Sequence, residues 1–281
     1  KAGDIVVSVG AGNTGVGGDV SMTAGESNSE SGGTMTLRTG YSTKSSSGNL
    51  FISTPNAGAS GVSGTVQMQT GSASAGTSGS FMMTTGDATS GKGGDITINI
   101  GTGNAGDGGD YSLVAGTTTG ANGDGGSITV TAGHSNDPSG NHGGSIAITA
   151  GHTKGSETSD HGGSITVNAG LSASGNGGDI SVATGYSEST SSGSFTFATP
   201  NAGTSGISGG FDVHTGTASN GDSGSYTLTT GDATSGKSGS MTMKIGTGNT
   251  GHGGRFELDA GDSKGGDGGS ITVTAGHSND P

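Results

Sequence analysis

Residues that can bind metal ions recur at one position of a sequence repeat, directly before a pair of glycines. In four successive repeats this position holds Asp107, Asp124, His142 and His161. If neighbouring repeats stack at about 5 Å, the four side chains form a ladder that could hold a divalent cation. All of them would approach from one side, so solvated surface groups are the alternative. We expect no resident metal and no other cofactor.

Charged and His residues also gather in three consecutive loops, 117–124, 134–142 and 152–161. Their repeats carry two, three and four more residues than the common length. Insertions in a repeat protein map to one edge, where they often bind partners, although tolerated surface loops are the alternative. The residues expected to make lateral contacts are Asp137, His142, Lys154, Glu157, Asp160 and His161.

The repeat that carries these residues is about 15 residues long and runs through the whole chain of 281 residues. Each repeat contains a short run in which apolar residues alternate with Ser, Thr, Asn or Lys, as in Ile128 and Val130 with Thr129 and Thr131 between and after them. A glycine, or twice a proline, closes each run. This period of two predicts half-buried strands with one apolar face.

The segments between the runs are too short for a crossover helix, which takes a dozen or more residues. They are rich in glycine, which allows the positive φ angles of tight turns. One strand and one short return per repeat predict an all-β fold, a single parallel β-solenoid of about 18 rungs with a 15-residue period. Pairs such as Ile128 and Val130 are expected to point into a thin core.

A longer repeat of about 145 residues overlies the short one. Residues 41–116 match 186–261 without a gap, with 44 of 76 positions identical, and 127–138 recurs as 270–281. Nine short repeats therefore make one larger unit. We expect residues 1–281 to form one continuous solenoid.

Composition excludes several classes of protein. The formal net charge of −13 disfavours nucleic acid as a partner, and no apolar run approaches the length of a membrane span, so we expect no membrane insertion. The chain has no cysteine and therefore no disulfide. Glycine accounts for 66 residues, but the steady alternation argues against disorder.

No group of residues has the pattern of a catalytic site, so we expect no enzymatic activity. Glu257 and Asp259, with Arg255 nearby, fit an exposed strand face better than an acid–base pair. Outward threonine pairs are typical of ice-binding solenoids, but Arg38 and Lys244 interrupt the same columns. Ice binding is therefore a minor alternative.

The motifs at 126–133 (Gly-Ser-Ile-Thr-Val-Thr-Ala-Gly) and 178–185 resemble the repeats of giant secreted β-solenoid proteins, the filamentous adhesins of bacteria and the Gly/Ser/Thr-rich cell-surface repeat proteins of algae. The resemblance implies an extracellular or cell-surface fibre. The leading hypothesis is a structural protein, a filament segment that self-associates end to end or laterally. An adhesin stalk that binds a surface or a glycan is the alternative, and a fragment of a polysaccharide-active enzyme is a third.

Overall fold

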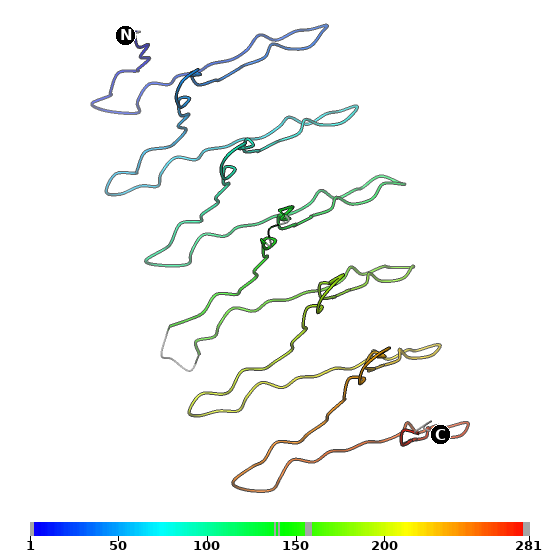
Figure 1. Cartoon of the computed structure of the whole chain (residues 1–281). Coiled ribbons are helices and arrows are strands. Elements are labelled where there is room, and N and C mark those ends of the chain that lie inside the picture. Colours follow the sequence, from blue (N-terminus) through cyan, green and yellow to red (C-terminus); the bar gives the residue numbers. More distant parts are fainter. Residues whose placement is uncertain (1–2, 138, 140, 155–158, 278–281) are drawn as a thin grey trace. The chain divides into compact units, whose positions relative to one another are not determined.

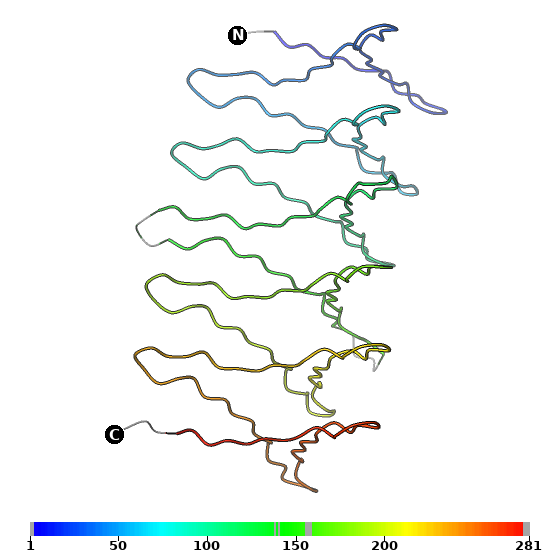
Figure 2. The ribbon, with the colours of Figure 1, turned by 90° about the vertical axis from the view of Figure 1, so that its right-hand side faces the viewer.

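The computed structural model describes residues 3–137, 139, 141–154 and 159–277. Within this part the chain contains no helix and no β-strand. It runs in extended segments that turn back on themselves again and again, as both views show (Figure 1, Figure 2). Two units, Lys1–Ser145 and Ile146–Pro281, are built in this same way.

Outside the second and third enlarged loops, each reversal in the described residues is a bend or turn of three residues in the glycine-rich part of a repeat, as the sequence predicts. The bends lie at 13–15, 28–30, 43–45, 59–61, 74–76, 89–91, 104–106, 120–122, 173–175, 188–190, 204–206, 219–221, 234–236, 249–251 and 264–266. Their spacing follows the repeat of about 15 residues. No helix in the described ranges is long and apolar enough to cross a membrane.

The prediction of a parallel β-solenoid is wrong. A solenoid needs backbone hydrogen bonds between one repeat and the next, along strands that stack side by side. In the described part of the chain, nine backbone hydrogen bonds form, and each joins the two ends of one loop. The repeats therefore close on themselves, and no ladder links their extended segments.

The closing bond has the same form in each of these loops. The N–H of a glycine at the end of the loop donates to the carbonyl of the glycine that closed the preceding run, as in Gly33 N to Gly25 O at 2.8 Å. Gly48 N to Gly40 O at 3.0 Å and Gly178 N to Gly170 O at 2.9 Å repeat this arrangement. We call these bonded ends the loop neck.

At several necks the two ends approach so closely that glycine fits better than any residue with a Cβ. A Cβ on Gly33 would lie 3.1 Å from the backbone nitrogen of Gly25 and 3.5 Å from the Cβ of Ala24. The residue before the closing glycine is correspondingly small, most often Ala or Thr. Ala24, Ala115, Ala132 and Ala150 are half-buried there. With the bulkier Ile100 in this place, the bond from Gly109 to Gly101 lengthens to 3.5 Å.

Two kinds of turn follow the closing residue. In the first, a serine two positions later caps the bend: Ser42 Oγ accepts from the Ser45 N–H at 3.0 Å, and Ser172 Oγ accepts from the Gly175 N–H at 2.8 Å. In the second, a glycine about five positions later takes a positive φ, as at Gly76 (φ 109). Both explain why small polar residues and glycine fill this part of the repeat.

The expected core strip is also absent from the described residues. No side chain there is buried, and Ile128 and Val130 are 52% and 67% exposed. The predicted alternation appears as a difference in the exposed fraction of successive side chains. Leu50 and Ile52 are 59% and 58% exposed, whereas Phe51 between them is 84% exposed. The period of two is therefore correct, but the face that it defines stays largely exposed. One contact between repeats is that of Phe197 with Phe211, whose ring centroids lie 5.8 Å apart.

The total accessible surface of the chain, 27885 Å², also shows that little side-chain surface is buried. A folded monomer of this mass would expose roughly 10,600 Å², and a fully unfolded chain roughly 38,000 Å². Because apolar burial is the main force that offsets the loss of conformational entropy, the chain alone has little to hold its extended segments in place.

The loop neck leads to a first prediction. We expect Gly33→Ala to widen the neck and break its hydrogen bond, because the new Cβ would lie 3.1 Å from the backbone nitrogen of Gly25, closer than an ordinary van der Waals contact. Loss of a hydrogen bond worth about 1 kcal/mol should speed amide exchange at residue 33 about fivefold, measured by NMR. Gly32→Ala is the matched control, since its Cβ would make an ordinary 3.6 Å contact. Equal acceleration in both variants would contradict the role assigned to the neck.

Candidate functional site

The three enlarged loops keep the common neck and place their additional residues inside it. The closing bonds join Gly126 to Gly116 at 2.8 Å, Gly144 to Gly133 at 2.9 Å and Gly163 to Gly151 at 2.8 Å. Ordinary loops close over eight residues, as from Gly25 to Gly33. The insertions therefore lengthen the exposed loop and leave the path of the flanking segments unchanged.

Asp137 organises the second enlarged loop. Its Oδ1 accepts a hydrogen bond from the Ser139 N–H at 2.8 Å, and its Oδ2 accepts one from the side-chain amide of Asn141 at 2.8 Å. The bond from the Ser139 backbone is the main reason why the pKa of Asp137 lies below its ordinary value. The carboxylate therefore acts as a turn-forming acceptor for its own loop.

The other predicted contact residues lie on the surface. His142, Lys154, Asp160 and His161 are exposed, and Nδ1 of His161 is 2.7 Å from the carbonyl oxygen of Ser159. Glu157 lies outside the described residues. Whether these loops make lateral contacts stays a prediction.

The ladder expected for a cation is not assembled. Within the residues that the structure describes, no group of three or more His, Asp or Glu side chains could hold a metal ion. Asp107, Asp124 and His142 belong to the first unit, and His161 belongs to the second. The stacking that would align them depends on the solenoid, which does not form.

A second prediction concerns Asp137. Because its pKa is lowered in the structured loop, the loop should be fully stabilised above the ordinary pKa of Asp and should lose this stabilisation as the pH falls through the lowered pKa. We expect the Ser139 amide resonance to shift in that acidic range. Asp137→Asn keeps an acceptor but cannot titrate, so it should abolish the shift; a shift that persists in this variant would assign the effect to another group.

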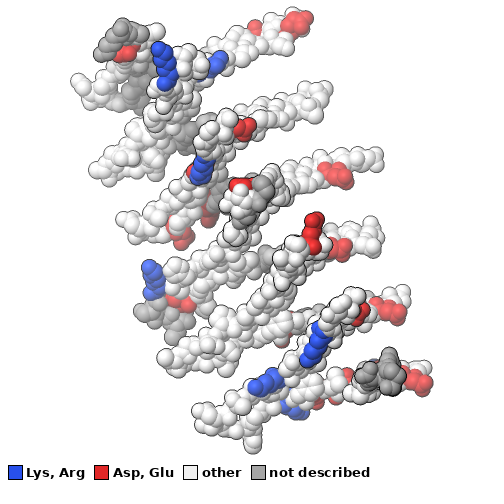
Figure 3. Space-filling model, viewed as in Figure 1, with Lys and Arg blue, Asp and Glu red and all other residues white. Residues whose placement is uncertain are grey.

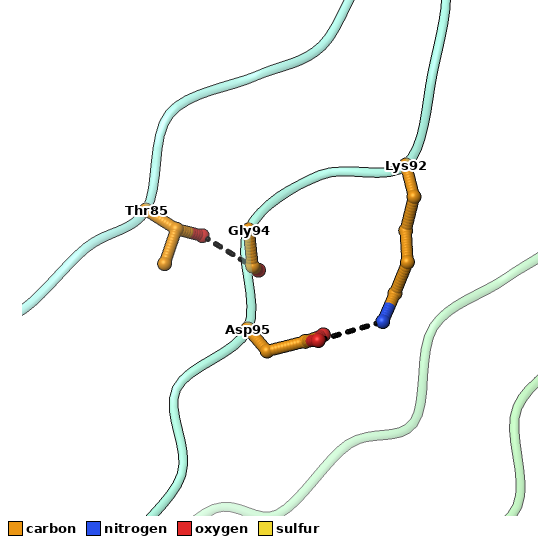
Figure 4. Close-up of polar contacts among 4 residues, drawn as sticks. All are labelled: Thr85, Lys92, Gly94 and Asp95. Atoms are coloured by element: carbon orange, nitrogen blue, oxygen red, sulfur yellow. Dashed lines mark hydrogen bonds and ion pairs between the residues drawn. The ribbon is translucent and has the colours of Figure 1, made fainter. Parts of the chain in front are cut away.

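In the loop after Gly86, side-chain contacts join the two ends of the loop. Thr85 Oγ1 donates to the Gly94 carbonyl at 3.1 Å, and Lys92 Nζ pairs with Asp95 Oδ2 at 2.7 Å (Figure 4). Both charged side chains are well exposed, so the ion pair adds little stability. The contacts shape the loop and carry no catalytic pattern.

One feature that the sequence did not single out is a shallow hollow of about 390 Å³ beside the neck at Gly40 and Gly48. Arg38, Tyr41 and Leu50 contribute to its wall. Arg38 stands out in an acidic chain, whose Asp and Glu side chains lie at several turning points on the face shown in Figure 3. The signal that would have found it is local: an arginine three residues before a tyrosine, at the start of a loop.

A second feature that the sequence did not single out is the loop neck. It could have been found from the fixed pairing of Ala-Gly or Thr-Gly with a glycine eight or more residues later.

Comparisons of this chain with protein-family models, curated proteins and solved structures found no match.

Proposed function

We propose that this chain is a structural protein, a segment of an extracellular filament or cell-surface fibre that self-associates. The observation that carries the proposal is the exposure of the apolar pairs. They recur with the 15-residue repeat from Ile5 and Val7 to Ile271 and Val273, and all of them are exposed.

Such a surface suits association with many copies of one simple partner. Contiguous exposed apolar surface usually marks an interaction site, and here it extends along the chain in small identical steps. The loop necks support the same proposal, because they repeat one local closure along the chain. The extracellular location rests on the resemblance of the repeat motifs to those of secreted repeat proteins.

An adhesive stalk is the second candidate, and the hollow beside Arg38 and Tyr41 favours it. An aromatic ring and a guanidinium group on an open surface can contact a sugar ring and an acidic substituent. The hollow occurs beside one loop, however, whereas the apolar pairs occur throughout the chain. The repeated feature therefore supports the structural role more strongly.

The test is whether the chain assembles. Purified protein should shift from monomer to large assemblies over about a 100-fold range of concentration, measured by sedimentation velocity, and electron microscopy should show filaments. A chain that stays monomeric throughout this range would refute the proposal. Specific binding of acidic glycans by such a monomer, lost in Arg38→Ala, would favour the adhesive role instead.

A further inference from the structure

Segments that correspond to each other in the repeat of about 145 residues carry opposite charge. Residues 31–86 contain Arg38 and Lys44 and no Asp or Glu, which gives a formal charge of +2. The corresponding residues 176–231 contain no Lys or Arg and four acidic residues, which gives −4. These acidic residues are Asp179, Glu188, Asp212 and Asp222. We call the two segments the basic segment and the acidic segment.

Apart from charge, the two segments have closely similar construction. Tyr41 and Tyr186 are both 85% exposed, and Ser42 and Ser187 are both half-buried caps of their turns. The necks at Gly48 and Gly193 close with bonds of 3.0 and 2.9 Å. The charged residues of both segments are exposed. The segments therefore present similar surfaces that differ mainly in sign.

We propose, building on the filament function above, that copies of this chain associate with a stagger of one 145-residue unit, so that the basic segment of one copy lies along the acidic segment of the next. The occupant of the exposed apolar surface is then a second copy of the same chain. Lys44 corresponds to Ser189 under this stagger, directly beside Glu188. Arg38 corresponds to Ala183, between Asp179 and Glu188.

The spacing of the repeats favours this stagger over shorter ones. Residues 41–116 and 186–261 match without a gap, so apolar pairs stay aligned over that whole range. A shift of a single repeat would lose the alignment at the enlarged loops, where the repeat lengthens by two to four residues. Association without a stagger keeps the alignment but places the acidic segment against itself, which like-charge repulsion opposes.

A stagger also explains how copies of this chain can build an open-ended filament. Each copy offers its basic segment to one neighbour and its acidic segment to another, which is a heterologous contact. Such contacts do not close unless the rotation between copies returns to the start. Growth can therefore continue in both directions with a single type of contact.

Chemical cross-linking tests the stagger directly. Lys44 is the only lysine of the basic segment, and that segment holds no carboxylate. A zero-length carbodiimide reagent, which joins amines to carboxylates, should link Lys44 to Glu188 in the assembled protein. In a mixture of ¹⁵N-labelled and unlabelled chains, about half of these linked peptides should combine both isotopes, as random mixing of copies requires. Assemblies that lack this link, or show it only within one chain, would overturn the stagger.

Charge variants provide the second arm. Arg38→Glu with Lys44→Glu should raise the concentration needed for assembly about tenfold at low salt, and less at high salt, because screening removes the repulsion. Lys237→Glu with Lys264→Glu makes the same change in net charge outside both segments. This control should change the concentration needed for assembly less than about threefold. Adding Asp179→Lys and Glu188→Lys to the first variant should restore assembly.

The outcomes separate the two proposals. Equal losses in the two charge-reversal variants would show that only net charge matters and would overturn the stagger, while assembly of the unaltered protein would still support the filament. Failure of the extra lysines to restore assembly would also count against the stagger. Absence of assembly in the unaltered protein would refute both.

Discussion

Replacing Ile128 and Val130 together with Asp is expected to raise the concentration needed for assembly about 100-fold, because each apolar contact contributes about 1 kcal/mol and a desolvated carboxylate adds to the loss. Both side chains are more than half exposed in the single chain, at 52% and 67%, so the substitution removes little that the monomer buries. The effect should therefore be much larger on assembly than on the monomer. Sedimentation velocity and light scattering would measure it.

The matched control for this prediction is the double substitution of Thr129 and Thr131 with Asp. It introduces the same charge in the same repeat, on the alternate positions of the run. We expect a change of less than about threefold, as repulsion between solvated charges is weak. If the threonine variant impaired assembly as much as the isoleucine and valine variant, the apolar pairs would not be the contact surface.

The order of the extended segments is expected to depend on protein concentration. Because the described chain buries no side chain, association must supply the free energy that holds these segments, and a ligand or partner that binds only the ordered state stabilises it by mass action. Above the assembly threshold, exchange of the Ile96 amide should slow by at least about 100-fold relative to dilute protein. Hydrogen exchange with mass spectrometry would show this.

The loop necks provide the internal comparison for that experiment. The Gly33 and Gly163 amides already donate hydrogen bonds within the single chain, at 2.8 Å in both cases. Their exchange should therefore change much less with concentration than that of Ile96. Strong protection of Ile96 in dilute protein would mean that the single chain orders its own extended segments, and the proposed dependence on association would be wrong.

Local features of the chain could be predicted from the sequence. The alternation of Leu50, Phe51 and Ile52 appears as a difference in exposure, since neighbouring side chains of an extended segment point to opposite sides. The bends fall in the glycine-rich stretches, and the residues inserted between Gly116 and Gly126 lie inside a loop. Each of these properties depends on residues a few positions apart.

The candidate site was predictable only in part. The sequence pointed to the enlarged loops, and the structure adds that Asp137 binds the Ser139 amide within its own loop. The ladder of Asp107, Asp124, His142 and His161 depended on stacking between repeats and not on any local signal, and the described residues do not assemble it. The hollow beside Arg38 was missed for the opposite reason: it arises from the closure of one loop neck, which brings Ser47 near Tyr41.

The sequence by itself determined the repeat, the position of each turn, the small residues of the neck and the period of two in the extended segments. Tertiary structure alone decided where the backbone hydrogen bonds and the apolar faces find partners. An apolar pair such as Ile96 and Ile98 looks the same in the sequence whether its partner is the next repeat or another chain. In this structure glycines such as Gly25 and Gly33 bond to each other across the loop. The apolar pairs of the described residues stay largely exposed, because no second layer covers them there.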